Sequence, residues 1–407
     1  MKPLKGIKIV EFATYVVVPI AARVLSDWGA EVIKIEAASG DDWRRNGYVF
    51  NLPCDDDSNP LYAVSNSGKD MISLNLKTPE GKEALFKMLA EADIFMTNIR
   101  YAGIERLGLS WETLHEMFPK LIYFHFNGFG YEGPWKDRPG FDTAAFWAMS
   151  GALAEFGEKG SKPMYTPPAF GDISTSGMAL GGIMAALYHR ERTGEGLRLT
   201  TSLLASGMWC NHPRIIGLQD RTDGKVSHIT WPAHPHELRN PFSNIYECKD
   251  GRMMLFAAGW ETAFHKFLPA AGLAEYMTDP RFSTPEATVE NATALYHLFA
   301  AAYLTKTCDE WDQILTDLDL VHQELMASRD IPNMEQAWVN GYQTHLNCPN
   351  GDHFVVPNSP VTFFGIDNPP TQHVGGVGCD TSKVLARYGY SEEQIRAMLE
   401  SGAAAGK

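Results

Sequence analysis

The sequence predicts an α/β protein in which a large Rossmann-like domain with a parallel sheet is joined to a smaller α+β domain. Apolar runs of strand length alternate with helical patterns from residue 6 to residue 126, which is typical of parallel strands with helical crossovers. Hydrophobic residues make up 44% and charged residues 21% of the chain, as in ordinary globular proteins. The 407 residues are enough for two domains.

The opening segment reads as a strand over 6–13, a helix over 19–28 and a second strand over 30–36. The turn at 13–19 between the first strand and the helix contains no glycine. The Gly-rich fingerprint that cradles a dinucleotide pyrophosphate is therefore absent, which counts against a dehydrogenase. The sequence also contains no Walker A loop and no GxSxG nucleophile motif.

The alternation continues with further strands and helices up to residue 126. Thr78-Pro79-Glu80 predicts a helix start, because Thr is a good N-cap and Pro fits the first helical position. A Gly-rich loop at 127–134 leads to a predicted helix over 141–153. The other expected strands cover 71–76, 93–98, 121–126 and 197–202, and the other helices cover 78–92, 103–107, 110–117 and 203–218.

A change of composition near residue 220 predicts a domain boundary. Asp250-Gly251 lies between two strand-like runs and predicts a hairpin turn, and helical patterns dominate 262–328. Ser391 and Gln394 form a capping-box pattern that opens a terminal helix. We therefore expect a large domain over 1–220, a small domain over 221–330, and a linker with a return to the large domain over 331–407.

Residues 165–190 are the segment from which we infer chemistry. Two prolines keep the approach extended, Gly171 permits a sharp turn, and a run of small apolar residues predicts a buried helix that begins at Asp172. A carboxylate there faces the positive end of the helix dipole and free N–H groups, which favour its ionised form. Such a carboxylate can attack an activated acyl group. The alternative is that Asp172 is only an N-cap.

Charge and cysteine usage exclude several classes of protein. The net charge of −14 counts against nucleic acid or an anionic membrane as the partner, although an anionic small molecule needs only a local cluster of cations. Six scattered cysteines without a CxxC pair argue against a zinc site and fit reduced cytoplasmic thiols. Without an apolar leader or a long apolar run, we expect a cytoplasmic protein.

Several ordered motifs resemble a known family. They include residues 4–12, 27–36, 40–44, 74–81, 128–134 and 138–142, and above all Gly171-Asp172 with its helix, closed by residues 193–196. Together they resemble the class III CoA-transferases, which also include carnitine and formyl-CoA transferases. Within that family, the sequences of residues 40–44 and 141–147 are similar to those of the branch that acts on 2-hydroxy acids, such as phenyllactate and 2-hydroxyisocaproate.

The resemblance implies that Asp172 is the nucleophile and becomes an aspartyl-CoA thioester during turnover. It implies an interlocked homodimer with an acyl-CoA and a small carboxylic acid as substrates, no tightly bound cofactor and no metal. Taken alone, each basic residue would be a solvated surface charge. The CoA contacts that the resemblance implies are Thr14, Tyr15, Val16, Val17, Arg44, Leu74, Lys77, Asn98, Ile99, Arg100, Arg106, Lys136 and Arg138.

The sequence departs from the family pattern in places, and alternatives stay open. Ala37 replaces an arginine of the oxalate-specific members, and the four-glycine loop of those members has no counterpart in this sequence. His234 and His236 lie in the corresponding region, either as active-site groups or as partly buried loop residues. Four side chains are candidates for an apolar acyl pocket, or alternatively for the core: Trp147, Met149, Trp209 and Trp231.

Three other functions compete with this hypothesis. The racemases of the family use a histidine one residue before the aspartate that matches Asp142, and this chain has Phe141 there, which cannot shuttle a proton. A silent acyl-CoA-binding protein would have lost the nucleophile, but Asp172 is present. A carnitine- or formyl-CoA-type transferase with another acid is the third alternative.

Overall fold

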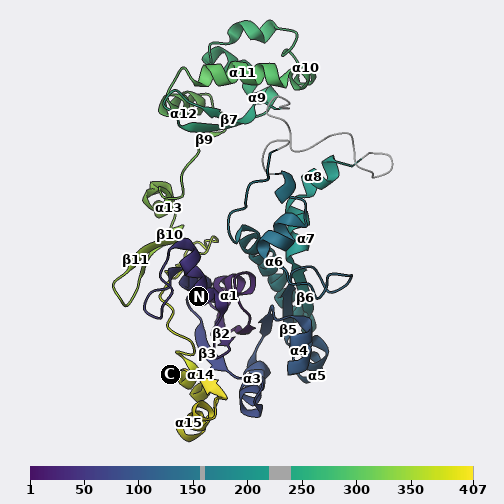
Figure 1. The fold of residues 1–407 in the computed structure, drawn as a ribbon, viewed down its shortest axis with the longest axis vertical. Coiled ribbons are helices and arrows are strands. Elements are labelled where there is room, and N and C mark those ends of the chain that lie inside the picture. The colour runs from purple at the N-terminus through teal and green to yellow at the C-terminus, as the bar shows by residue number, and fades with distance from the viewer. Residues whose placement is uncertain (156–160, 220–239, 407) are drawn as a thin grey trace. The chain divides into compact units, whose positions relative to one another are not determined.

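The computed structural model describes residues 1–155, 161–219 and 240–406 (Figure 1). The chain divides into two compact units. The first contains Met1–Leu153, Tyr165–Gly217 and Met334–Lys407, and the second contains Ala154–Met164 and Leu218–Asn333. The units thus divide at 217/218 and 333/334, where the sequence placed boundaries at 220/221 and 330/331.

The first unit is built on a seven-stranded sheet in the order β12-β3-β2-β1-β4-β5-β6. All neighbours are parallel except β12, which pairs antiparallel with β3. The prediction of an α/β fold with a parallel sheet is therefore confirmed. The strands are β1 (Lys8–Phe12), β2 (Glu31–Glu36), β3 (Asp70–Leu74), β4 (Ile94–Thr97), β5 (Ile122–Asn127), β6 (Arg198–Ser202) and β12 (Ala404–Ala405).

Helices cover both faces of this sheet. One apolar cluster joins alternate side chains of the strands to α1 (Val17–Asp27) and α6 (Phe170–Thr193). The other cluster joins the intervening side chains to the helices of the opposite face, because successive residues of a strand point to opposite sides. Those helices are α3 (Pro79–Glu91), α4 (Tyr101–Leu107), α5 (Trp111–Met117), α14 (Thr381–Arg387) and α15 (Glu392–Glu400).

Local capping signals in the sequence are observed in the structure. The Thr78 side chain accepts a hydrogen bond from the Gly81 N–H at the start of α3. Ser391 and Gln394 form both halves of the capping box that opens α15. These short-range signals could be identified because the partners lie within three residues of each other.

The predicted helix start at Asp172 is wrong by two residues. Helix α6 begins at Phe170, and Ala169 before it takes a left-handed conformation with φ of 57°. Asp172 is therefore the third helical residue, and α6 has no side-chain capping hydrogen bond. The alternative that Asp172 is an N-cap is contradicted, because the cap position belongs to Ala169.

Two other predicted helices differ from the structure. Residues 141–153 form a π-helical segment, η2 (Asp142–Ala148), followed by a 3-10 turn, η3 (Leu153–Glu155). Residues 203–218 divide at Asn211 into α7 (Leu203–Cys210) and α8 (His212–Gly217).

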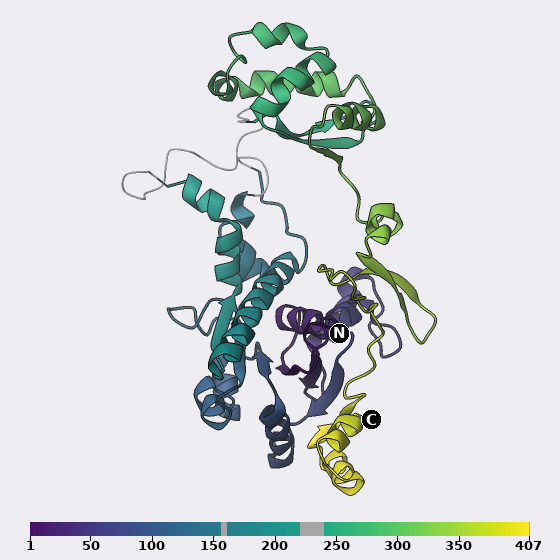
Figure 2. The ribbon, with the colours of Figure 1, turned by 180° about the vertical axis from the view of Figure 1, so that it is seen from behind.

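The sequence analysis missed several elements on the side of the sheet near β3. These are a 3-10 helix, η1 (Asp42–Phe50), the helix α2 (Pro60–Asn66) and a β-hairpin (Figure 2). The hairpin joins β10 (Gln343–Asn347) to β11 (His353–Pro357) in the region that was predicted as a linker with a return to the large domain. Leu346 and Val356 of the hairpin pack with Tyr62 of α2, so the segment belongs to the core of the first unit.

The second unit is a small α+β domain. Its sheet contains β7 (Ser243–Glu247), β8 (Met253–Ala257) and β9 (His322–Glu324), all antiparallel, with the predicted turn at Asp250–Gly251. One face packs on an aromatic core that includes Tyr246 and Tyr303, whose rings stack 4.6 Å apart. The main helices are α9 (Trp260–Ala270), α10 (Pro285–Glu290), α11 (Ala292–Tyr303) and α12 (Cys308–Asp317).

Candidate active site

A cavity of about 1440 Å³ lies at the carboxyl ends of the strands of the first unit. Its wall includes the turn after β1, the segment after β4, the loop after β5 and the start of α6. The strand order reverses direction between β1 and β4, because β2 and β3 are added on one side of β1 while β5 and β6 are added on the far side of β4. Open parallel sheets bind ligands at such a crevice.

Buried charged side chains hold the turn after β1 in place. Tyr15 has a positive φ of 65°, and its N–H donates to Asp41 Oδ1 over 3.0 Å. The Lys34 ammonium donates to the Ala13 carbonyl and to Glu11, each over 2.8 Å, and lies 3.1 Å from Asp41. Burial alone would favour the neutral amine, but Glu11 and Asp41 raise the pKa of Lys34. The turn therefore keeps a strained backbone that pairing with a buried network stabilises.

The two halves of the crevice are tied together by one asparagine. The Asn98 side chain accepts from the Thr14 N–H over 3.0 Å and donates to the Thr14 carbonyl over 2.6 Å. This reciprocal pair holds the end of β4 against the turn after β1. It also explains why Thr14 and Asn98 both line the cavity.

Asp172 is a half-buried carboxylate that lines this cavity. Burial, with a smaller contribution from the charge of Asp142, raises the pKa of Asp172 to about 7. The sequence predicted that the helix N-terminus favours an ionised group, whereas here desolvation outweighs that effect. A carboxylate poorly solvated in this way is a stronger nucleophile once it is ionised.

The carboxylate of Asp142 lies at the amino-terminal end of helix α6. It is buried, and burial raises its pKa, while the N–H groups of Asp172 and Gly171 and the side chain of Trp147 act in the opposite direction. Neither carboxylate oxygen of Asp142 reaches the geometry of a full hydrogen bond. The positive end of the helix is thus directed at Asp142, which in turn lies against the nucleophile candidate.

Gly171 is the residue that permits this close approach. A Cβ placed there would lie 2.2 Å from Asp142 Oδ1 and 2.3 Å from Cγ of Phe146. No side chain fits at those distances, so only glycine allows the carboxylate and the helix end to meet.

Cationic side chains line the cavity although the protein as a whole is acidic. Arg100 and Arg106 come from the region of α4, Lys136 and Arg138 from the loop after β5, and Arg198 from β6. Local clustering of this kind is what a polyanionic ligand needs.

Ten of the thirteen predicted contact residues line the cavity. They are Thr14, Tyr15, Val16, Val17, Asn98, Ile99, Arg100, Arg106, Lys136 and Arg138. The structure brings them together from three separate segments of the chain. Their role in binding CoA stays a prediction.

The other three predicted contact residues lie elsewhere. The Arg44 guanidinium is buried in an ion pair with Glu36 over 3.0 Å and donates to the Gly375 carbonyl over 2.9 Å. Leu74 is buried in β3, and Lys77 is exposed just beyond it. The sequence could not show that Glu36, eight residues away, already pairs with Arg44.

A polar cluster on the wall of the cavity was not predicted from the sequence. His125, Tyr131 and Arg198 all line it, and the Tyr131 hydroxyl hydrogen-bonds His125 Nδ1. The only sequence signal was a histidine in an otherwise apolar strand, which core packing explains equally well.

Three of the four candidate side chains for an apolar acyl pocket lie in the part of the chain that the structure describes. Trp147 is buried against Phe170, with the ring centroids 5.8 Å apart, while Met149 and Trp209 are exposed. None of these three lines the cavity. Trp231, His234 and His236 lie outside the described residues.

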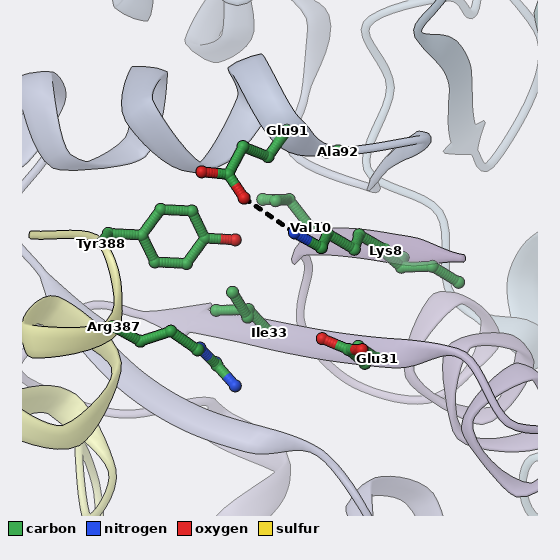
Figure 3. Close-up of a pocket in the computed structure, with 9 residues that line it drawn as sticks. Lys8, Val10, Glu31, Ile33, Glu91, Ala92, Arg387 and Tyr388 are labelled. Carbon is green, nitrogen blue, oxygen red and sulfur yellow. Dashed lines mark hydrogen bonds and ion pairs between the residues drawn. The ribbon is translucent and has the colours of Figure 1, made fainter. Parts of the chain in front are cut away.

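A second pocket lies near the amino ends of β1 and β2 and holds only about 30 Å³ (Figure 3). Lys8 pairs with Glu91 over 2.7 Å at its edge, beside Tyr388 and Arg387. That volume admits about one water molecule. The large cavity is therefore the candidate active site.

Two other properties of the described residues bear on function. No group of three or more His, Cys, Asp or Glu side chains in that part of the chain could hold a metal ion. None of the described helices is long and apolar enough to cross a bilayer.

The fold and the cavity define an open α/β protein with a cation-lined crevice beside a pair of buried carboxyl groups. A sequence model of CoA-transferase family III matches residues 4–378. The chain therefore belongs to CoA-transferase family III, as the motifs predicted, and it is an enzyme of that family.

Individual relatives agree with this assignment over nearly the whole chain. The chain is 34% identical to the (R)-2-hydroxy-4-methylpentanoate CoA-transferase of Clostridioides difficile, covering 98% of each sequence. It is 34% identical to the cinnamoyl-CoA:phenyllactate CoA-transferase of Clostridium sporogenes, covering 96% of this chain and 94% of the relative. A crystal structure of a CAIB/BAIF family protein from Brucella suis matches with a TM-score of 0.78 and 26% identity, covering 95% and 99% of the two chains.

Proposed function

We propose that this enzyme moves CoA from an acyl-CoA thioester to a 2-hydroxy acid through a covalent aspartyl-CoA thioester on Asp172. One observation carries the proposal: Asp172 and five cationic side chains line the same cavity at the switch point of the sheet. The strand order 3-2-1-4-5-6 within that sheet supports the Rossmann-like description. A CoA nucleotide bound at the cations would direct its thioester towards the carboxylate.

The first half-reaction begins at the ionised Asp172 carboxylate. A carboxylate oxygen attacks the thioester carbonyl carbon, the C–S bond breaks, and CoA leaves as a thiolate while a mixed anhydride forms. The thiolate then attacks the Asp172 carbonyl carbon and releases the donor acid. The product is CoA linked to the enzyme as a thioester, so no ATP is needed.

The second half-reaction reverses these steps with a different acid. The acceptor carboxylate attacks the Asp172 thioester and releases the thiolate, and a second mixed anhydride forms. The thiolate attacks the acyl carbon of the acceptor, which leaves as its CoA thioester and restores the Asp172 carboxylate. Water must be excluded throughout, because it would hydrolyse the anhydride.

Asp142 adjusts the nucleophile rather than replacing it. Its charge and the burial of the site place the pKa of Asp172 at about 7, so a substantial fraction of Asp172 is ionised at neutral pH. The N–H groups at the start of α6 lie against Asp142, so they hold its charge beside Asp172.

The proposal of a 2-hydroxy acid as acceptor comes from the two relatives with named 2-hydroxy acid substrates. The racemase alternative is not favoured, because Phe141 stands where the racemases of the family have a histidine, and its ring packs edge-on against Tyr15 with centroids 5.3 Å apart. A phenyl ring cannot accept the α-proton. By family resemblance we also propose an interlocked homodimer in the cytoplasm, with a role in amino-acid fermentation.

Trapping the intermediate tests this function directly. The enzyme is mixed with an acyl-CoA donor in the absence of acceptor and quenched with hydroxylamine or borohydride, and the modified peptide is located by mass spectrometry. We expect the tag on Asp172, its loss in Asp172→Asn, and its retention in Asp137→Asn, since Asp137 is an exposed aspartate of the same cavity wall. A tag on another residue, or none, would refute the mechanism.

The acceptor is then identified with a panel of acids against one donor. Aromatic and branched 2-hydroxy acids should react faster than their 2-deoxy analogues. A clear preference for oxalate or another short diacid would instead support a formyl-CoA-type transferase.

A further inference from the structure

The wall of the cavity along β5 and β6 contains a cluster of polar side chains to which the proposed reaction assigns no individual roles. Arg198 pairs with Tyr123 and Thr200 pairs with His125 in the register of the two strands. Because alternate residues of a strand share a face, these side chains all leave the sheet on the side of α4 and α5. Tyr131, from the loop after β5, lies over them and also lines the cavity.

His125 orients Tyr131. The histidine Nε2 lies 2.8 Å from the Ile99 carbonyl, so Nε2 carries the proton and donates it. Nδ1 is then an acceptor, and the Tyr131 hydroxyl donates to it. Burial lowers the pKa of His125 to about 4, which keeps the ring in this neutral tautomer at neutral pH. These two hydrogen bonds therefore connect Ile99, in the segment after β4, through His125 to Tyr131 on the loop after β5.

Tyr131 in turn seats Arg198. The guanidinium carbon lies 4.6 Å from the centre of the tyrosine ring, a cation–π distance. Because the hydroxyl proton of Tyr131 points at His125, the oxygen of that hydroxyl has lone pairs left for the guanidinium. Arg198 is thus held in one place before any ligand binds, which reduces the entropy lost on binding.

The only anionic side chain recorded at Arg198 among the described residues is a weak partner. Glu112 Oε1 accepts from Arg198 Nη1 over 3.3 Å, and its side chain is 62% exposed. Such a surface ion pair contributes little. A guanidinium has five N–H donors, so Arg198 has capacity for a further anion, and its side chain is 31% exposed.

We propose that Arg198, seated on Tyr131 and oriented through His125, binds a phosphate of the nucleotide half of coenzyme A. A planar guanidinium matches a phosphate with two parallel hydrogen bonds. Lys136 and Arg138 stand on the same loop as Tyr131 and line the same cavity, so the phosphate site is built from β6 and this loop together. The inference rests on the proposed function, since it names a further contact to the same substrate.

Calorimetric titration with coenzyme A and with pantetheine, which lacks all phosphates, tests the assignment. Arg198→Gln should weaken coenzyme A binding on the order of 10-fold to 100-fold, as expected for a lost charged hydrogen bond, and leave pantetheine binding unchanged. Arg198→Lys should restore part of the affinity, because it keeps the charge without the planar fork. Tyr131→Phe keeps the ring and should weaken coenzyme A about 2-fold to 10-fold.

Arg192→Gln is the matched control. Arg192 also lies over a tyrosine, with its guanidinium carbon 5.7 Å from the ring centre of Tyr188, but neither residue lines the cavity. Its substitution should leave both titrations unchanged. Unaltered coenzyme A affinity in Arg198→Gln, or an equal loss for pantetheine, would overturn the inference and leave the proposed function intact. Failure of the unsubstituted enzyme to bind coenzyme A would overturn the proposed function itself.

Discussion

Replacing Asp142 by Asn tests the electrostatic coupling of the two carboxyl groups. The pKa of Asp172 rises from an ordinary 3.8 to about 7, and burial contributes more to that rise than the charge of Asp142 does. Asparagine keeps the size of the side chain and removes the charge. The pKa of Asp172 should therefore fall, and by less than half of that rise.

The rate of the first half-reaction reports this pKa, because only the ionised Asp172 attacks. In a single turnover without acceptor, the quenched enzyme-bound thioester is followed from pH 5 to pH 9. The unsubstituted enzyme should show an inflection near pH 7. In Asp142→Asn the inflection should move to lower pH, and each unit of that shift raises the ionised fraction at pH 6, from about one tenth to about one half for one unit, a gain of about 5-fold.

Asp137→Asn is the matched control for this experiment. It removes one negative charge from the same cavity wall, but Asp137 does not contribute to the pKa of Asp172. Its inflection should stay near pH 7. An unchanged inflection in Asp142→Asn, or one that moves to higher pH, would show that Asp142 does not raise the pKa of the nucleophile.

Three further substitutions are matched to clear outcomes. Because the fold raises the pKa of Asp172, this carboxyl group favours folding when it is protonated and loses that advantage as the pH rises from about 4 through 7. Asp172→Asn should therefore raise the free energy of unfolding on the order of 2–4 kcal/mol at pH 8 and hardly change it at pH 4. Equal gains at both pH values would contradict this reasoning. Gly171→Ala has no space for its methyl group and should cost about 1–3 kcal/mol in urea unfolding and abolish thioester formation, whereas Gly177→Ala, open in the same helix, should stabilise by up to about 1 kcal/mol; similar results for both would refute the steric argument. Glu11→Gln removes the buried carboxylate that pairs with the ammonium groups of Lys34 and Lys69 and should cost about 3–5 kcal/mol, because it leaves Lys69 without its carboxylate while Lys34 keeps Asp41. The exposed Glu91→Gln should cost less than about 1 kcal/mol, and comparable losses would show that the buried network does not stabilise the fold.

Local patterns predicted the elements whose stabilising partners lie close in sequence. The strands of the parallel sheet and the caps at Thr78 and Ser391 were found because periodicity and capping act over a few residues. Strand β12 could not be predicted, since two alanines carry no strand signal and only the free edge of β3 selects them. The two-residue error at Asp172 arose because the left-handed turn falls on Ala169, a residue that rarely adopts it.

The sequence could predict those residues of the candidate site that match family positions one by one, but not the contacts between them. Asn98 and Arg106 match positions at which the resemblance implies a CoA contact, and both line the cavity. Arg44 matches a motif as well, yet a buried ion pair engages it, and no one-dimensional pattern reveals which arginine is paired. Arg198 went unrecognised for the converse reason, since its relation to Tyr131 exists only once β5 and β6 lie side by side.

The pairing of β12 with β3 has a consequence for how the protein is made. Ala404 and Ala405 cover an edge whose strand ends at Leu74, and the whole second unit is encoded between them. At about 5–20 residues per second, a ribosome needs roughly 15–65 s to travel from one strand to the other. During that time the edge of β3 in the nascent sheet is unpaired and can pair with another chain, so we expect the nascent protein to be prone to aggregation at this edge until β12 is made.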